Sequence, residues 1–221
     1  MEVVQRVEDT PGARQPARDT LVETALRYAE DRHWDVVPGA SVVEDAAGRH
    51  CSCGRPGCST PGAHPILRDW AVEASGSPAL VRRWWTEHPD AAILLPTGRG
   101  FDVIDVPEQA GCLALARLER MGLPLGPVIA TPTRRLQFFV LPGARDKMGE
   151  MLRRIGWGSS AIDLVAKGEG DWVVAPPSRM GGSGSADWAR EPTELNRWLP
   201  EARELVSPIA YACGRAMAEA R

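Results

Sequence analysis

Long apolar runs are missing from this sequence. A helix that crosses a bilayer needs about 20 consecutive apolar residues, and no segment of the chain approaches that length. The N-terminus is polar and acidic, with Glu2, Glu8 and Asp9, and it lacks the basic start and apolar stretch of a secretory signal. We therefore expect a cytoplasmic protein that makes no use of a membrane.

An excess of positive charge is missing as well. Lysine occurs only at Lys147 and Lys167, and the 26 lysines and arginines are outnumbered by 29 acidic residues, for a formal net charge of −3. This balance excludes a protein coated in basic surface for wrapping nucleic acid. It still allows a local basic groove, because the distribution of charge matters more than its sum.

What is present is the composition of an ordinary globular protein. The 221 residues are 43% hydrophobic and 25% charged, which suits one sizeable domain. Residues 1–18 contain Pro11, Gly12 and Pro16 and show no apolar periodicity, which predicts a mobile tail. We expect the main domain over residues 19–192 and a C-terminal helical region over residues 193–221.

The order of the expected elements predicts an α+β fold. Apolar residues at helical spacing indicate one helix from about Thr20 and another that begins after Ser77. A third helix is expected over residues 113–121. Short valine-rich and aromatic runs bounded by glycine and proline indicate strands over residues 34–37, 91–95, 101–106, 128–131, 137–141, 162–165 and 172–175. Strands that cluster between helices favour a mixed or antiparallel sheet.

Three of the five cysteines lie close together in the sequence. Cys51, Cys53 and Cys58, followed by His64, supply the three thiolates and one imidazole of a closed tetrahedral zinc site. In a reducing compartment such a cluster is more typical of a metal site than of disulfides. Because protein side chains fill every coordination position, we expect the zinc to be structural.

The ligand set has alternatives. The Cys-x-Cys spacing is tighter than the usual Cys-x-x-Cys, and His50 competes with His64 as the fourth ligand, although we favour His64. The other interpretation is a flexible loop whose cysteines are incidental and pair only on oxidation. The glycines and prolines of residues 44–66 argue against any regular element there, so we expect metal binding and ordering of the loop to be coupled.

Aspartates stand within two of the apolar runs. In the strand expected over residues 101–106, alternation places Asp105 with Val103 on one face and Asp102 on the other. Asp163 lies in the apolar run 162–165. A buried aspartate is costly unless it is paired, hydrogen-bonded or metal-bound. Asp105 and Asp163 are therefore candidate site residues, and the alternative is that Asp105 only ends its strand.

Together these features resemble the bifunctional DNA primase-polymerase domain of the archaeo-eukaryotic primase superfamily. The resemblance covers about residues 20–190. It rests on the early helix at 25–29, the cysteine loop that ends Pro-Gly-Ala-His-Pro at 61–65, Arg-Trp-Trp at 83–85, Pro-Thr-Gly at 96–98, the acidic strand, and the run 172–178 that follows Asp163. It implies a primase-polymerase fold with a zinc-binding loop.

The resemblance also implies a catalytic site. In that family an Asp-x-Asp or Asp-x-Glu pair ends the strand and, with a third acid, holds the Mg²⁺ or Mn²⁺ ions of nucleotidyl transfer. A histidine on a neighbouring strand contacts the phosphates of the incoming nucleotide. Asp105 matches the first acid and Asp163 the third, but the second falls on Pro107 and the histidine on Leu136. Glu108 is one residue out of phase with the pair.

Arg134 and Arg135 replace the glycines that usually precede that histidine. They could bind a phosphate or a nucleic-acid backbone, or they could simply be solvated. We predict a family member with a degraded catalytic site that binds single-stranded DNA, a nucleotide or a protein partner. The alternatives are an active DNA primase/polymerase with a rearranged metal site, which would need Mg²⁺ or Mn²⁺, and an adaptor that binds only protein. No Walker A loop is present, so a role in DNA replication would need a partner.

Overall fold

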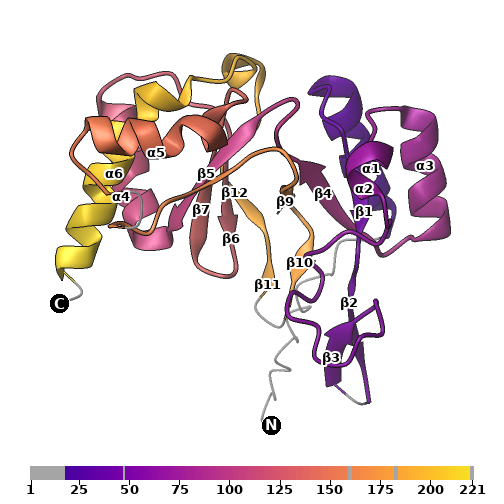
Figure 1. Ribbon diagram of the computed structural model, residues 1–221. Coiled ribbons are helices and arrows are strands. Elements are labelled where there is room, and N and C mark those ends of the chain that lie inside the picture. The colour runs from indigo at the N-terminus through magenta and orange to yellow at the C-terminus, as the bar shows by residue number, and fades with distance from the viewer. Residues whose placement is uncertain (1–17, 47, 159–160, 182–183, 220–221) are drawn as a thin grey trace, which may run out of the picture.

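A five-stranded antiparallel sheet organises the computed structural model, which describes residues 18–46, 48–158, 161–181 and 184–219 (Figure 1). Its strands lie in the order β12 (Asp187–Arg190), β6 (Val128–Thr131), β7 (Arg135–Val140), β5 (Asp102–Pro107) and β8 (Val165–Lys167). A smaller antiparallel sheet has the order β1 (Val37–Gly39), β4 (Ala92–Pro96) and β9 (Trp172–Val174).

Helices gather in two groups beside these sheets (Figure 1). One group packs on a face of the larger sheet and consists of α4 (Glu108–Arg120), α5 (Ala144–Arg154) and α6 (Ala202–Glu219). The other group lies beside the smaller sheet and consists of α1 (Arg18–Asp31), α2 (Trp70–Glu73) and α3 (Pro78–Glu87). No helix in the described part of the chain is both long and apolar enough to cross a bilayer.

Two short hairpins and a helical turn complete the fold. One hairpin joins β2 (Val42–Asp45) to β3 (Gly48–Cys51) and projects from the body of the molecule in Figure 1. The other joins β10 (Arg179–Met180) to β11 (Gly184–Ser185). A 3₁₀ turn, η1 (Glu194–Asn196), precedes α6.

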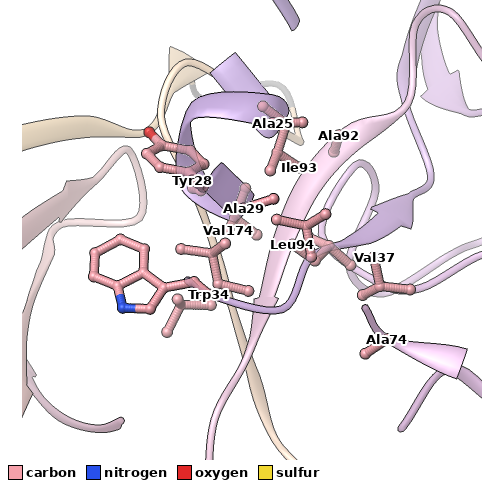
Figure 2. Close-up of a cluster of buried hydrophobic side chains, with 14 of the residues drawn as sticks. Ala25, Tyr28, Ala29, Trp34, Val37, Ala74, Ala92, Ile93, Leu94 and Val174 are labelled. Atoms are coloured by element: carbon pink, nitrogen blue, oxygen red, sulfur yellow. The ribbon is translucent and has the colours of Figure 1, made fainter. Parts of the chain in front are cut away.

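The larger sheet separates two apolar cores. One core joins α1 and α3 to β4 and to Phe101, Val103 and Phe139 of the larger sheet. Figure 2 shows part of it, with Ala25 and Ala29 of α1 beside Ile93 and Leu94 of β4. The second core lies under α4, α5 and α6 and takes Ile104 and Val106 from β5. Because β5 is covered on both faces, a charged residue on it has to find a partner within the protein.

The α+β fold class is confirmed, and most elements lie near their predicted positions. The helix predicted from Thr20 corresponds to α1, and the strand predicted over 128–131 is β6. The tail predicted for residues 1–18 lies outside the described residues except for Arg18, where α1 begins. The C-terminal region predicted to be helical contains α6, which continues through Pro208 and buries this residue.

Three local predictions were wrong. The cysteine segment does contain a regular element, since β2 and β3 pair from Val42–Cys51 to Asp45–Gly48. The run 162–165 is not a strand, because β8 begins only at Val165 and Asp163 precedes it. Helix α5 was not predicted. Its apolar residues Ala144, Met148 and Leu152 do lie on one buried side, and that spacing was the signal that could have found it.

Candidate functional site

The cysteine segment forms a compact donor cluster. One ligand atom from each of Cys51, Cys53, Cys58 and His64 lies within 4.8 Å of every other. Cys51 ends β3, and the chain then turns through Gly54 and other glycines with positive φ. A left-handed backbone is cheap only for glycine, so the glycines let one short segment return all four donors to one point. These side chains can hold a metal ion such as zinc.

His64, rather than His50, joins this cluster. The Nε2 atom of His64 lies 3.3 Å from Cys51 Sγ, and its Nδ1 lies 3.0 Å from the carbonyl oxygen of Pro65. A backbone carbonyl that accepts the Nδ1 proton leaves Nε2 free to bind a metal. His50 is on the exposed hairpin, with its Nε2 atom 3.8 Å from Asp45.

The thiols of the cluster differ in acidity. A hydrogen bond from the backbone of Arg55, with further contributions from neighbouring side chains, lowers the pKa of Cys53 to about 6. Burial raises the pKa of Cys51. Metal binding needs thiolates, so Cys53 is the donor best prepared to receive an ion at neutral pH.

The cluster is fastened to the rest of the fold by backbone and indole contacts. The Ala40 amide donates to the His64 carbonyl at 2.8 Å, and the Gly181 amide donates to the Pro61 carbonyl at 2.7 Å. The indole Nε1 of Trp172, on β9, donates to the Ala63 carbonyl at 2.8 Å. The metal loop is therefore positioned against the smaller sheet.

A second polar cluster surrounds Asp105 on β5. Its side chain is only 7% exposed. Its Oδ2 accepts a hydrogen bond of 2.7 Å from Gln137 Nε2 and lies 3.7 Å from Lys167 Nζ. Its Oδ1 accepts a hydrogen bond from Arg135 Nε. The interpretation that Asp105 only ends its strand is therefore wrong, because both carboxylate oxygens have partners.

Arg135 also binds Asp163. Its Nη1 and Nη2 atoms donate to the two carboxylate oxygens of Asp163 at 2.9 and 2.8 Å, and Nη2 also donates to the Asp105 carbonyl at 3.2 Å. Hydrogen bonds from Arg135 hold the pKa of Asp163 below its usual value, and those to Asp163 raise the pKa of Arg135. The structure thus brings Asp105 and Asp163 together, with the guanidinium of Arg135 between them.

Residues 25–198 match the family described as bifunctional DNA primase/polymerase, N-terminal. That range spans most of the chain and contains both clusters. The chain belongs to this primase-polymerase family. A search of curated proteins found no match.

Two positions of the primase-polymerase site can now be placed on the sheet. Pro107 stands two residues after Asp105 on β5 and pairs with Arg135. The expectation that Leu136 replaces the family histidine was wrong. Leu136 is buried in the core under α4, on the opposite face of β7 from Asp105, whereas Gln137 pairs with Asp105 and contacts it. Gln137 is therefore the residue that occupies the position beside the first acid.

The two other acids near this primase-polymerase site are engaged elsewhere. Asp102 Oδ2 accepts hydrogen bonds from the backbone amides of Gly143 and Arg145 at 3.1 and 3.0 Å, so it stabilises the start of α5 on the opposite face of β5. Glu108 Oε2 lies 3.1 Å from Arg134 Nε. Within the described ranges, the Cys51–His64 cluster is the only group of three or more such side chains placed to share a metal ion.

Arg134 stands where the resemblance places a glycine, and its backbone has a conformation that glycine favours. Its φ is +61°, a value that glycine adopts easily and other residues rarely do. The side chain is 84% exposed, with Nε in the ion pair with Glu108. Arg134 therefore presents its guanidinium at the surface, while the adjacent Arg135 turns into the acid cluster.

Proposed function

We propose that this protein binds single-stranded nucleic acid or a nucleotide on a primase-polymerase domain that does not catalyse nucleotidyl transfer. The family match supports the nucleic-acid or nucleotide partner in general terms. The observation that carries the loss of catalysis is Pro107 at the second carboxylate position, because a proline side chain has no atom that can ligate a metal.

The neighbouring residues support the same proposal. Gln137, which stands beside Asp105, cannot donate from a protonated ring as a histidine can. A rearranged metal site would need Asp102 or Glu108 as a ligand. Asp102 instead accepts hydrogen bonds at the start of α5, and Glu108 pairs with Arg134. Stabilisation of the charge that develops on the phosphoryl group supplies most of the rate in such transfers. Two altered positions at one site should therefore abolish the reaction.

We further propose that the metal in the Cys51–His64 cluster is zinc with a structural role. Three thiolates and an imidazole fill a tetrahedral site completely and leave no position for a substrate or a water. The cluster orders the loop that contacts Trp172 of the smaller sheet.

A primer assay tests the catalytic proposal. With Mg²⁺ or Mn²⁺, a primed template and all nucleotides, we expect neither primer synthesis nor primer extension from the wild type. Each missing contributor typically costs on the order of a hundredfold in rate, although two such losses need not simply add. Product should be followed on denaturing gels over long incubations.

The Asp105→Ala variant is the control for contaminating polymerases, since any background should be equal in both proteins. Extension by the wild type that disappears in an Asp105→Ala protein shown by circular dichroism to be folded would overturn the proposal and establish a rearranged catalytic site. A variant that combines Pro107→Asp, Arg134→Gly, Arg135→Gly and Gln137→His restores the family residues, and a gain of extension there would confirm how the positions correspond.

Binding is expected to be weak and salt-sensitive, through Arg134. Of the two arginines predicted to bind phosphate, Arg134 is exposed and Arg135 is engaged by the two acids. Each phosphate contact to a single strand adds about 0.7 to the slope of log K against log salt. Arg134→Ala should therefore weaken binding and reduce this slope by about 0.7, as measured by fluorescence anisotropy with single-stranded DNA across a salt series.

Arg120→Ala is a matched control for this measurement, because Arg120 is an exposed arginine at the far end of α4. Equal slopes in the wild type and the Arg134→Ala variant would remove Arg134 from the interface.

A protein partner is the second candidate function. Leu195 of η1 is 98% exposed, and Trp198, between η1 and α6, is 87% exposed. Large apolar side chains this exposed are typical of surfaces that bind another protein. If neither single-stranded DNA nor a nucleotide binds in the anisotropy series, the protein-binding adaptor becomes the preferred function.

A further inference from the structure

The charged side chains around Asp105 sum to zero, as the charges of two acids and a bound divalent cation would. Asp105 and Asp163 carry two negative charges, and Arg135 and Lys167 carry two positive ones within 4 Å of them. Lys167 is held in place, since its Nζ donates to the carbonyl of Trp172 at 3.3 Å. A further cation entering between the two acids would find their charge already compensated.

Arg135 fills the space between the acids with hydrogen bonds as well as with charge. It makes four hydrogen bonds to these two residues: three to carboxylate oxygens and one to the Asp105 carbonyl. The contact with Asp163 is bidentate, which is the geometry that binds a carboxylate most specifically. The carboxylate oxygens that a divalent ion would need as ligands are therefore already used.

Strand geometry explains why Arg135 reaches this position. Residues 135, 137 and 139 lie on one face of β7, because side chains alternate along a strand. Gln137 contacts Asp105, and Phe139 packs in the core of that face. Arg135 is the first residue of β7, directly after the tight turn at Arg134. Its long side chain thus extends along the sheet to both acids.

We propose that the guanidinium of Arg135 takes the place of a divalent cation between Asp105 and Asp163, so that the wild-type site does not bind Mg²⁺ or Mn²⁺ and removal of this side chain creates a cation site. The inference rests on the proposed loss of catalysis but concerns the acids themselves. Gln137 provides a third oxygen, since its Oε1 is buried and has no hydrogen-bond partner among the described residues. Two carboxylates and an amide oxygen suit Mn²⁺ or Mg²⁺.

Direct measurement of Mn²⁺ binding tests this proposal. The zinc-loaded protein is titrated with Mn²⁺, and free Mn²⁺ is followed by its electron paramagnetic resonance signal. We expect little binding by the wild type and affinity on the order of a hundredfold higher in Arg135→Ala, because removal of one positive charge at contact distance has an effect of this order. The Asp105→Asn change in the Arg135→Ala background should abolish the gain.

Two further variants make the result decisive. Arg120→Ala removes an exposed arginine at the end of α4 and leaves the acid cluster intact, so its Mn²⁺ affinity should equal that of the wild type. Arg135→Gln removes the charge but keeps the unbranched start of the side chain and a polar end, and it should also gain affinity, which keeps the test valid if Arg135→Ala does not fold. Wild-type affinity equal to that of both Arg135 variants would overturn the proposal, as would the absence of a gain in a folded variant. Mn²⁺ binding by the wild type without nucleotide incorporation would reject this inference and leave the proposed function standing.

Discussion

The Cys53→Ser variant should lose nearly all of the zinc that the wild-type protein carries. We expect about one zinc per chain in the wild type, since the four donors match one closed tetrahedral site. A serine hydroxyl does not replace the thiolate, and the remaining three donors lose the closed geometry. Elemental analysis after purification without chelators measures the content of both proteins.

Zinc loss should also disorder the loop. Apparent binding free energies of structural zinc in small domains are about 10 kcal/mol or more. Without the metal, the hydrogen bonds from Trp172 and Gly181 to this loop would have to hold it in place, and they are too few to do so. Cys112→Ser is the matched control, because Cys112 is an exposed thiol on α4 outside the cluster and its loss should leave the zinc content unchanged. Full retention of zinc by Cys53→Ser would reject the ligand assignment.

Removal of the Asp105 carboxylate should strongly destabilise the protein. In an acid pair built to bind metal, neutralising one carboxylate relieves repulsion and raises stability in the absence of metal. Here the carboxylate is buried and paired, so Asp105→Ala leaves Arg135 and Lys167 without their shared partner. Breaking such a pair costs about 3 kcal/mol, and urea denaturation measures the change in the free energy of unfolding.

Asp163→Ala supplies the comparison. Asp163 contacts the same guanidinium, but its side chain is 52% exposed. Solvent screens exposed ion pairs, so the expected loss is below about 1 kcal/mol. A rise in stability for Asp105→Ala would show that the acids repel each other and that Arg135 does not compensate them.

Local patterns predicted much of the fold because they depend on local physics. The alternation of apolar residues placed Asp105 and Val103 on one face of β5, and the register with Gln137 agrees. The four donors of the Cys51–His64 cluster could be predicted from the sequence, because a short glycine-rich segment with three thiols and an imidazole has few other ways to become ordered. The choice of His64 over His50 needed coordinates, since only the hairpin geometry takes His50 away from the cluster.

The sequence by itself determined the fold family, the donor residues of the Cys51–His64 cluster and the proline two residues after Asp105, because each of these follows from residue identity and order. Tertiary structure decided what Asp105 and Asp163 contact. A shift of one residue along β7 reverses the face of a side chain, so the sheet register alone shows that Gln137, and not Leu136, stands beside Asp105. The direction of the Arg135 side chain also depends on the tertiary structure. The side chain is long enough to bridge two acids that lie 30 and 28 residues away in the chain.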